Sequence, residues 1–422
     1  MSEQKFSVDI PQELTSKDKA WRIIFIDTRK LNLWKAPQGV ATLVGEAMHN
    51  LHQPEIKGQT LHKIHIGEPK CTTRMRPEYT IGATKFLKEK GVDGVACGDT
   101  TVAYTGPRGH KENPVGNCET YTKLARKHGW SVSKAAGIHF VILDRPETSK
   151  DGEFRFDQQE YRIELEGINR FNDFYIAGGF AKSDFTINNA HLTLHGLAGV
   201  AGCVKSIAMG CTSLAGKLRM HQSLLPYFDS ARCVKCGKCV ENCPEDALTL
   251  PDDESTPVVD PDKCIGCGEC EAVCAVRKQA VTLKGRKITD WSRGEDTLPV
   301  RMTDYVIGIM SGADRVVQTP SGYTNKWDNT LHLLHMYAVT ERCDCIDVTQ
   351  KPLIAKDLGF LVGKNPFAMD KLAAEILVKE MNEQGVTIDD TSLLETADKS
   401  ARYAKQSYGI LDEVPVEKKT LS

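Results

Sequence analysis

Short apolar runs alternate with amphipathic segments along most of the chain. Runs rich in Val, Ile and Phe, mostly ending at Gly or Asp, predict strands at 22–27, 61–67, 92–99, 139–144 and 174–180. Helical patterns at 77–91 and 118–129 lie between such runs, and each closes with Gly after a basic last turn. This alternation predicts parallel βαβ units, and therefore an α/β fold with a mostly parallel sheet flanked by helices.

The same alternation resumes in the last part of the chain. Segments 303–313 and 332–345 continue it, and a long helix is expected over 366–384. Asn365 precedes that helix as a plausible N-cap, and a proline occupies the first helical position. The tail after Asp412 is polar, and we expect it to be loose.

The stretch from Ala190 to Cys211 could be a buried strand and helix, a membrane segment or the wall of a chemical site. The uncharged run that contains its first half, 185–204, carries Thr, Asn and His residues. A membrane span needs about 20 predominantly apolar residues, so the membrane interpretation fails. The N-terminus is polar and has no apolar secretory signal, which predicts a soluble, cytoplasmic protein.

Charge narrows the choice of partners. The chain of 422 residues has 54 Lys plus Arg against 56 Asp plus Glu, a formal net charge of -2. This balance gives no reason to expect nucleic acid or an anionic membrane as a partner.

Eight of the 15 cysteines fall in two short runs, each with the spacing C-x2-C-x2-C-x3-C. Bacterial two-cluster ferredoxins have this spacing, and the fourth cysteine of each run binds the other cluster. We therefore predict one [4Fe-4S] cluster on Cys233, Cys236, Cys239 and Cys274, and a second on Cys264, Cys267, Cys270 and Cys243. Zinc sites use separate C-x2-C pairs, and disulfides are disfavoured in the cytosol. Ala275 stands where the first run has Pro244, which leaves the ligands intact.

The cysteine runs suggest how the chain is divided. We expect an α/β domain formed by 1–227 and 286–422 and interrupted by an inserted ferredoxin-like α+β domain at 228–285. Within 229–284 there are 7 basic and 11 acidic residues, a formal charge of -4 before any cluster is added. This acidic surface is either an ordinary solvated face or a means of orienting a basic electron-donor or electron-acceptor protein.

Polar residues follow several of the predicted strands. In open parallel sheets ligands bind beyond the carboxyl ends of the strands. Near or just after the ends of two predicted strands, 61–67 and 92–99, lie the residues Lys63, His65, Glu68, Asp99, Thr100, Thr101, Tyr104 and Arg108. Each alone is weak evidence, because a single His is more often a core residue and a single Arg a surface charge.

Several runs resemble the uncharacterised family known as domain of unknown function 362, whose members often carry a two-cluster ferredoxin insert. The matching runs are KIHIGEP, GDTTVAYTGPRGH, HLTLHGLAGVAGCVKSIAMGCTSLAGKLRMH, YAVTERCDC and PLIAKDLGFLVGKNPFAMD. The resemblance implies an iron–sulfur protein with a shared pocket. It points to His195, Lys205, Cys211, Lys217 and His221. Cys203 and Arg342 depart from the family pattern.

The candidate site also includes His191, Cys343 and Cys345. The spacing of His191 and His195 places both imidazoles on one face of a helix or a strand. The two cysteines point the same way if their segment is extended. The His and Cys residues could line a substrate or cofactor pocket or bind a metal. The two cysteines could relay electrons as a thiol pair, or simply pack.

Four of the candidate residues are cations: Lys63, Arg108, Lys205 and Lys217. If they converge on one pocket, they predict a small anionic substrate, such as a carboxylate or phosphate. The alternative is that each pairs with a neighbouring Asp or Glu.

Three classes of function compete. In the first, a reductase, the clusters deliver low-potential electrons to a substrate, with a flavin or a further metal as an optional additional cofactor. The alternatives are a non-enzymatic ferredoxin-like electron carrier and a protein that handles metals or clusters. No G-x-G-x-x-G motif follows a strand, which argues against NAD in a Rossmann site. The size of the α/β part favours the reductase.

Overall fold

The computed structural model describes residues 8–30, 37–52, 54–92, 95–130, 138–146, 154–221, 224–243, 245–252, 255–264, 269–275, 280–285, 297–312, 323–388 and 398–420. Within these residues an eight-stranded sheet has the order β16-β1-β15-β14-β7-β2-β3-β4. Its strands are β1 (Ile23–Asp27), β2 (Thr60–Lys63), β3 (Val95–Asp99), β4 (Ile138–Ile142), β7 (Phe185–His191), β14 (Thr330–Met336), β15 (Gly359–Gly363) and β16 (Val416–Thr420). β15 runs antiparallel to both of its neighbours, and the other pairs are parallel. The predicted mostly parallel α/β sheet is confirmed.

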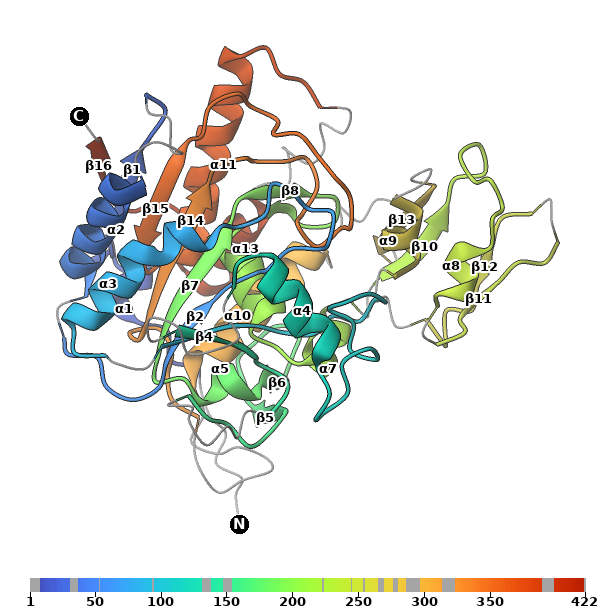
Figure 1. Cartoon of the computed structure of the whole chain (residues 1–422), viewed down its shortest axis with the longest axis horizontal. Helices are drawn as coiled ribbons and strands as arrows, with labels where there is room; N and C mark the ends of the chain where they lie inside the picture. The colour runs from blue at the N-terminus through green and yellow to red at the C-terminus, as the bar shows by residue number, and fades with distance from the viewer. Residues whose placement is uncertain are drawn as a thin grey trace.

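Helices cover both faces of this sheet (Figure 1). One face carries α2 (Pro37–Leu51), α3 (Ile81–Glu89) and α4 (Glu119–Lys127); the other carries α6 (Cys203–Gly210), α10 (Leu298–Ser311), α11 (Pro366–Glu383) and α13 (Lys399–Tyr408). Strand β3 shows why, because successive side chains point to opposite faces. Val95 packs in the core cluster of α2 and α3, whereas Ala96 packs in the cluster that contains residues of α6 and α10. The result is a three-layer sandwich with a separate core on each face.

Helix α11 begins as its sequence predicts. The side chain of Asn365 accepts hydrogen bonds from the backbone N–H groups of Phe367 and Ala368, both at 3.1 Å. These bonds satisfy two donors that the first turn of a helix leaves without partners. Pro366 occupies the first helical position, where its missing N–H removes no helical hydrogen bond.

Two expectations about elements need correction, and one segment without a predicted type is now assigned. The run at 174–180 forms β6 (Asp173–Ala177) and α5 (Gly178–Lys182), and β6 pairs antiparallel with β5 (Glu160–Glu164) in a separate two-stranded sheet. The tail after Asp412 is not loose, because β16 pairs with β1 at the edge of the large sheet. Segment 303–313, which the alternation pattern left without a type, belongs to α10 as far as Ser311.

The stretch from Ala190 to Cys211 is a strand end, a hairpin and a helix. It contains the end of β7, the hairpin β8 (Thr193–His195) with β9 (Gly199–Ala201), and α6. Among the described residues no helix has both the length and the apolar character needed to cross a membrane. Helix α7 (Leu214–His221) then leads to the cysteine-rich segment.

The cysteine-rich segment lies to one side of the large sheet (Figure 1). Its elements are β10 (Leu224–Phe228), α8 (Lys238–Glu241), β11 (Leu248–Thr249), β12 (Val258–Val259), α9 (Glu269–Ala275) and β13 (Val281–Gly285). β10 pairs antiparallel with β13, and β11 with β12, while α8 contacts α9. We call residues 224–285 the cysteine lobe.

Candidate functional site

The carboxyl ends of β2, β3 and β7 meet at one edge of the sheet because the three strands are parallel and adjacent. Their last residues are Lys63, Asp99 and His191, and all three are buried. The chain runs outward from β2 through β3 to β4 and then returns to β7 on the other side of β2. Such a change of direction is the topological switch point where open α/β sheets bind ligands. The sheet therefore places the predicted strand-end residues at the expected edge.

A buried ion network occupies this edge. Arg108 contacts Glu68 at 2.7 Å and Asp99 at 3.2 Å, and the ammonium of Lys63 lies 3.6 Å from Asp99. Tyr104 donates its hydroxyl hydrogen to Glu68 at 3.0 Å. Burial alone would raise the pKa of Asp99, but the charges of Arg108 and Lys63 outweigh burial and lower it. Carboxylates therefore already neutralise Lys63 and Arg108. This agrees with the alternative interpretation, in which each cation pairs with a neighbouring Asp or Glu and not with an anionic substrate.

Lys217, on α7, completes the same network with a different set of partners. Its ammonium donates to the hydroxyl of Thr100 at 2.9 Å and to the carbonyl of Thr212 at 2.7 Å. Burial lowers the pKa of Lys217 to about 8, although the charges of Asp144 and Asp99 act in the opposite direction. The positive charges of Lys63 and Arg108 also lower the pKa of Lys217. These cations therefore converge on one edge of the sheet.

A second group of side chains surrounds the ammonium of Lys205, on α6. It donates to the sulfur of Cys343 at 3.0 Å and to that of Cys345 at 3.7 Å. The backbone is not extended here: the N–H of Ile346 donates to the carbonyl of Cys343 at 3.0 Å, which closes a turn. The N–H of Cys345 also donates to the sulfur of Cys343 at 3.3 Å. The turn, not an extended strand, brings both sulfurs to Lys205.

The two sulfurs differ in their acidity. Burial raises the pKa of Cys343, but a hydrogen bond from Cys345 and the charge of Lys205 outweigh burial and lower it. The pKa of Cys345 is raised well above its ordinary value, first by its hydrogen bond to Cys343 and then by burial. Burial alone would lower the pKa of Lys205, but the two cysteines outweigh burial and raise it. The group therefore holds one thiolate, one thiol and one ammonium.

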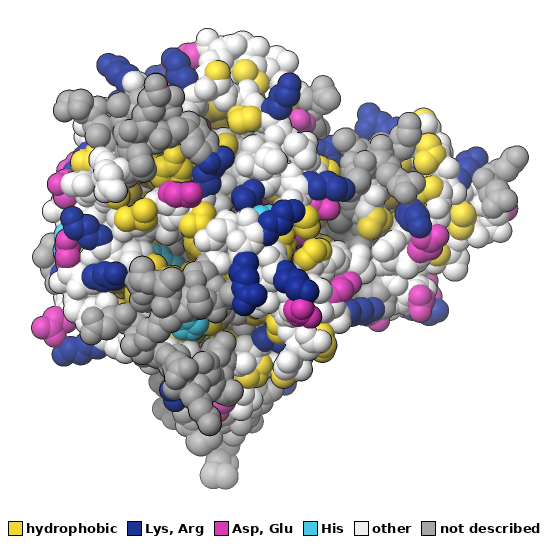
Figure 2. All heavy atoms as spheres, viewed as in Figure 1, with side chains coloured by type: hydrophobic (Ala, Val, Ile, Leu, Met, Phe, Trp, Pro, Cys, Tyr) yellow, Lys and Arg dark blue, Asp and Glu magenta, His cyan; other side chains and the backbone are white. Residues whose placement is uncertain are grey.

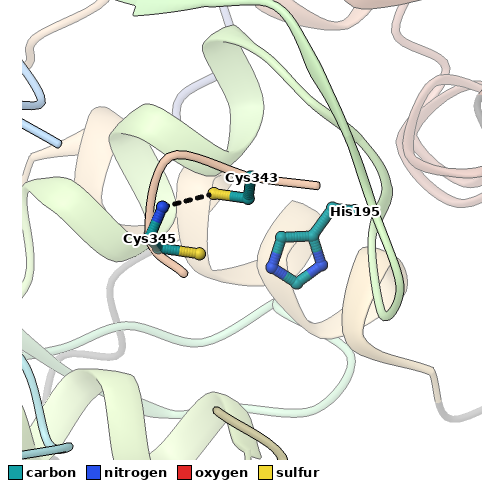
Figure 3. Close-up of side chains that lie close together, drawn as sticks. All are labelled: His195, Cys343 and Cys345. Atoms are coloured by element: carbon teal, nitrogen blue, oxygen red, sulfur yellow. Dashed lines mark hydrogen bonds between the residues drawn. The ribbon is translucent and has the colours of Figure 1, made fainter. Parts of the chain in front are cut away.

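His195 faces the same two sulfurs from the end of β8 (Figure 3). The ligand atoms of His195, Cys343 and Cys345 all lie within 4.8 Å of one another, which is the geometry of a candidate metal site. However, Nδ1 of His195 accepts hydrogen bonds from the N–H groups of Leu197 at 3.0 Å and Ala198 at 3.2 Å. Nδ1 therefore has no proton, and the neutral imidazole carries its proton on Nε2, the nitrogen turned toward the sulfurs. Metal-bound histidines normally donate from the other ring nitrogen, so this group is better suited to donate to sulfur than to hold a metal.

His191 has different partners from His195. Its Nδ1 lies 2.7 Å from the carboxylate of Asp344, and its Nε2 lies 2.7 Å from the carbonyl of Tyr337. Burial lowers the pKa of His191, but Asp344 outweighs burial and raises it. Both ring nitrogens of His191 face acceptors, so the site suits the charged imidazolium. Its bond to Asp344 holds in place the turn that carries Cys343 and Cys345. The two imidazoles do not act on one common partner.

The remaining predicted residues lie close to these groups. Nδ1 of His65 accepts from the N–H of Gly67 at 3.1 Å, and burial holds its pKa well below the ordinary value. The ring of His221 bonds to the carbonyl of Lys217 at 2.8 Å. Burial raises the pKa of the Cys211 thiol to about 12, which makes it a packing residue at neutral pH. Sequence reasoning missed Asp344, whose only signal was its place between two cysteines.

Seven of the eight predicted cluster cysteines lie within the described residues; Cys267 lies outside them. Burial raises the pKa of Cys239 to about 11, and the charges of Cys233 and Cys274 contribute in the same direction, so these three sulfurs lie near one another. Lys235 and Gly237 have φ values of 55° and 69°. Such left-handed residues make backbone N–H groups converge on a concave, anion-binding surface.

A hydrogen bond joins the cysteine lobe to the loop that follows β3 and carries Tyr104 and Arg108. The hydroxyl of Thr105 donates to the side-chain carbonyl of Asn242 at 3.5 Å. Thr105 follows Tyr104, and Asn242 precedes Cys243. Burial and the charge of Glu68 raise the pKa of Tyr104, and the neighbouring Cys345 and Cys343 act in the same direction. The loop therefore reaches from the cysteine lobe to the sulfur pair.

A family model with the description "Domain of unknown function (DUF362)" matches residues 61–375. The chain belongs to the DUF362 family. The DUF362 match begins in β2, ends in α11 and spans the cysteine lobe, so every candidate site residue lies inside it. The family's description assigns no function, and no curated protein matches the chain.

Proposed function

We propose that this DUF362 protein is a reductase-type oxidoreductase that passes low-potential electrons from two [4Fe-4S] clusters to a substrate at the strand ends. The observation that carries the proposal is the contact between Thr105 and Asn242. It links the residue beside a predicted cluster ligand to the loop that carries Tyr104 and Arg108. A passive carrier would not need its cluster region next to a buried, charged strand-end site.

The donor set of the cysteine lobe fits the clusters. Thiolates are the ligands of such clusters, and the proposed sets are Cys233, Cys236, Cys239 and Cys274 for one, and Cys264, Cys267, Cys270 and Cys243 for the other. The proximity of Cys274 to Cys233 and Cys239 supports the crossed pairing. The left-handed residues Lys235 and Gly237 support a loop whose N–H groups face bound sulfide. Bound clusters would supply electrons singly.

The residues at the carboxyl ends of the strands form a rigid wall of the proposed substrate site and provide a proton. Arg108, Glu68 and Asp99 hold one another in place, so the wall that they form changes little when a substrate enters. Lys217, with a pKa of about 8, carries a proton at neutral pH and releases it readily. Reduction of most bonds requires protons as well as electrons, and the Nζ of Lys217 is the proposed donor.

The surface supports an electron-transfer protein as a partner. Lys and Arg side chains gather on the face between the sheet and the cysteine lobe (Figure 2). The lobe itself has an excess of acidic residues. A partner that carries both signs of charge would be oriented by this pair of surfaces.

Metal analysis and spectroscopy of anaerobically purified protein test the proposal. We expect about eight irons and about eight sulfides per chain, and cluster signals in the electron paramagnetic resonance spectrum after reduction. Zinc without sulfide would contradict the proposal. An optical spectrum of the supernatant after acid removal of the clusters shows whether a flavin is also bound.

A further inference from the structure

The sulfur pair of Cys343 and Cys345 has the arrangement of a reactive dithiol. The two residues are the first and third of a hydrogen-bonded turn, which brings their backbones close. Their sulfurs lie within 4.8 Å of each other. A disulfide requires the two sulfurs to come within about 2.05 Å of each other, and rotation about the Cα–Cβ bond of either residue moves its sulfur along that path.

Three donors face the pair. They are the ammonium of Lys205, the N–H of Cys345 and the Nε2–H of His195. Hydrogen-bond donors of this kind offset the cost of burying a negatively charged thiolate. The thiolate is the nucleophile in disulfide exchange. The tautomer of His195 leaves Nε2 as a donor, so the group is arranged to stabilise negative sulfur and not to coordinate a cation.

The pair is also accessible from one side. Cys343 is 5% exposed, whereas Cys345, Lys205 and His195 are half-buried. Cys203 and Cys211, on the neighbouring α6 segment, are fully buried at 0%. An incoming group therefore reaches the turn from the side of Cys345 and His195. Among these thiols only the turn pair combines donors with partial exposure.

We propose that Cys343 and Cys345 form a redox-active dithiol whose substrate is a disulfide. The Cys343 thiolate attacks one sulfur of R–S–S–R and releases R–S⁻, which leaves a mixed disulfide. The sulfur of Cys345 then attacks Cys343, loses its proton and releases the second R–S⁻. One of the two released thiolates takes up the proton of Cys345. The products are the Cys343–Cys345 disulfide, one thiol and one thiolate, so atoms, protons and charge balance.

Regeneration rests on the proposed function. Opening the Cys343–Cys345 disulfide to one thiolate and one thiol takes two electrons and one proton. Two clusters that each give one electron match this requirement. The substrate class of the strand-end site would then be disulfides, with the dithiol standing between the clusters and the substrate.

Peptide mapping of the full-length protein tests the dithiol. Trypsin cuts after Arg342 and Lys356, because the Lys351–Pro352 bond resists cleavage, and the peptide 343–356 contains no other cysteine. After anaerobic treatment with oxidised glutathione we expect this peptide to be two hydrogens lighter and to resist alkylation until a reductant is added. A peptide that still takes up two alkyl groups, or a bound zinc that protects it, would overturn the inference.

Two variants keep the test independent of folding defects. Cys345→Ser should hold glutathione on Cys343 as a stable mixed disulfide. Lys205→Met should slow alkylation of Cys343 at pH 7 about tenfold, because loss of an adjacent cation raises a thiol pKa by one unit or more. Lys85→Met, on the exposed side of α3, is the matched control and should leave the rate unchanged. An unchanged rate in Lys205→Met, with no trapped adduct in Cys345→Ser, would contradict the dithiol.

A further comparison separates the inference from the proposed function. A reduced viologen should reopen the 343–345 disulfide in the wild type, and much more slowly in Cys243→Ala, which lacks a ligand of the second cluster. Closure by glutathione should be the same in both. Normal closure with equal reopening rates would contradict the electron route and leave the dithiol standing, whereas failure of closure would contradict the dithiol alone.

Discussion

Cysteines occupy two contrasting settings in this molecule. At the turn that follows β14, Cys343 is buried and its negative charge is balanced by Lys205. In the cysteine lobe, Cys233 and Cys239 are half-buried and Cys236 is exposed. Among the described residues the strands of the lobe are short and few of its apolar side chains are buried, whereas each face of the large sheet has its own cluster of buried side chains. The same residue type is stabilised by protein charges in one region, and in the other we propose that it binds iron–sulfur clusters.

The largest expected effect concerns the cysteine lobe. Cys239→Ala should lose one of the two clusters, and therefore about four of about eight irons, because each cluster needs a full set of thiolates. Cys203→Ala, on buried α6, should keep all the iron. Iron and sulfide analysis of anaerobic protein measures both variants. Equal iron contents would remove the proposed contrast between the two kinds of cysteine.

The second prediction concerns the buried charges of the strand-end site. Arg108→Met should lower the free energy of unfolding by about 3–5 kcal/mol, because Glu68 and Asp99 would remain buried without their cation. Lys123→Met removes an exposed ion pair with Glu119 and should change the free energy of unfolding by less than about 1 kcal/mol. Denaturant titration of both variants gives the difference. Similar losses would mean that burial does not set the strength of this network.

The third prediction uses pH. Folded Lys217 releases its proton near pH 8, and the unfolded chain does so near the ordinary value of 10.5. Between these values the unfolded state binds more protons, so this lysine makes stability rise with pH. The free energy of unfolding of the wild type should therefore rise, relative to Lys217→Met, by about 3 kcal/mol from pH 7 to pH 10.5. A constant difference across this range would show that Lys217 is not desolvated.

The smallest stability effect is expected at the contact between the two regions. Thr105→Ala removes the hydroxyl that bonds to Asn242 at an exposed position, and should change the free energy of unfolding by less than about 0.5 kcal/mol. It should nevertheless slow the reopening of the 343–345 disulfide by reduced clusters. The control is Thr15→Ala, which loses an exposed hydrogen bond near the N-terminus, distant in sequence from Thr105. A normal reopening rate in Thr105→Ala would mean that electrons take another route.

Much of the fold could be predicted because its signals are local. Strands β1, β3 and β4 are short apolar runs, and α11 has its cap and proline next to each other in sequence. Strand β7, at the centre, gave no such signal because it buries polar side chains. Asn189, for example, bonds to His62 of the neighbouring strand at 3.1 Å, a partner that only the fold supplies. Strand β16 was missed for a related reason, since its charged residues form a strand only by pairing with β1.

The candidate site divides in the same way. The strand-end positions of Lys63 and Asp99 could be predicted from the topology rule for parallel sheets. The meeting of His195, Lys205 and the 343–345 turn could not, because about 140 residues of sequence separate the turn from its partners. The sequence also does not indicate which nitrogen of His195 carries the proton, since the two N–H groups that decide this lie in the turn between β8 and β9.

The pairing of β10 with β13 has a consequence for the history and the engineering of the chain. Because these strands lie side by side and antiparallel, the chain leaves the sheet domain and returns to it at neighbouring points. Arg301 of α10 donates to the carbonyls of Arg219 and Met220 at the end of α7, so the two points are tied together without help from the lobe. A gene fragment that encodes the lobe could therefore be excised and replaced by a short linker, or exchanged for a different module, while the large sheet keeps its topology. The lobe could thus be removed or exchanged as one unit.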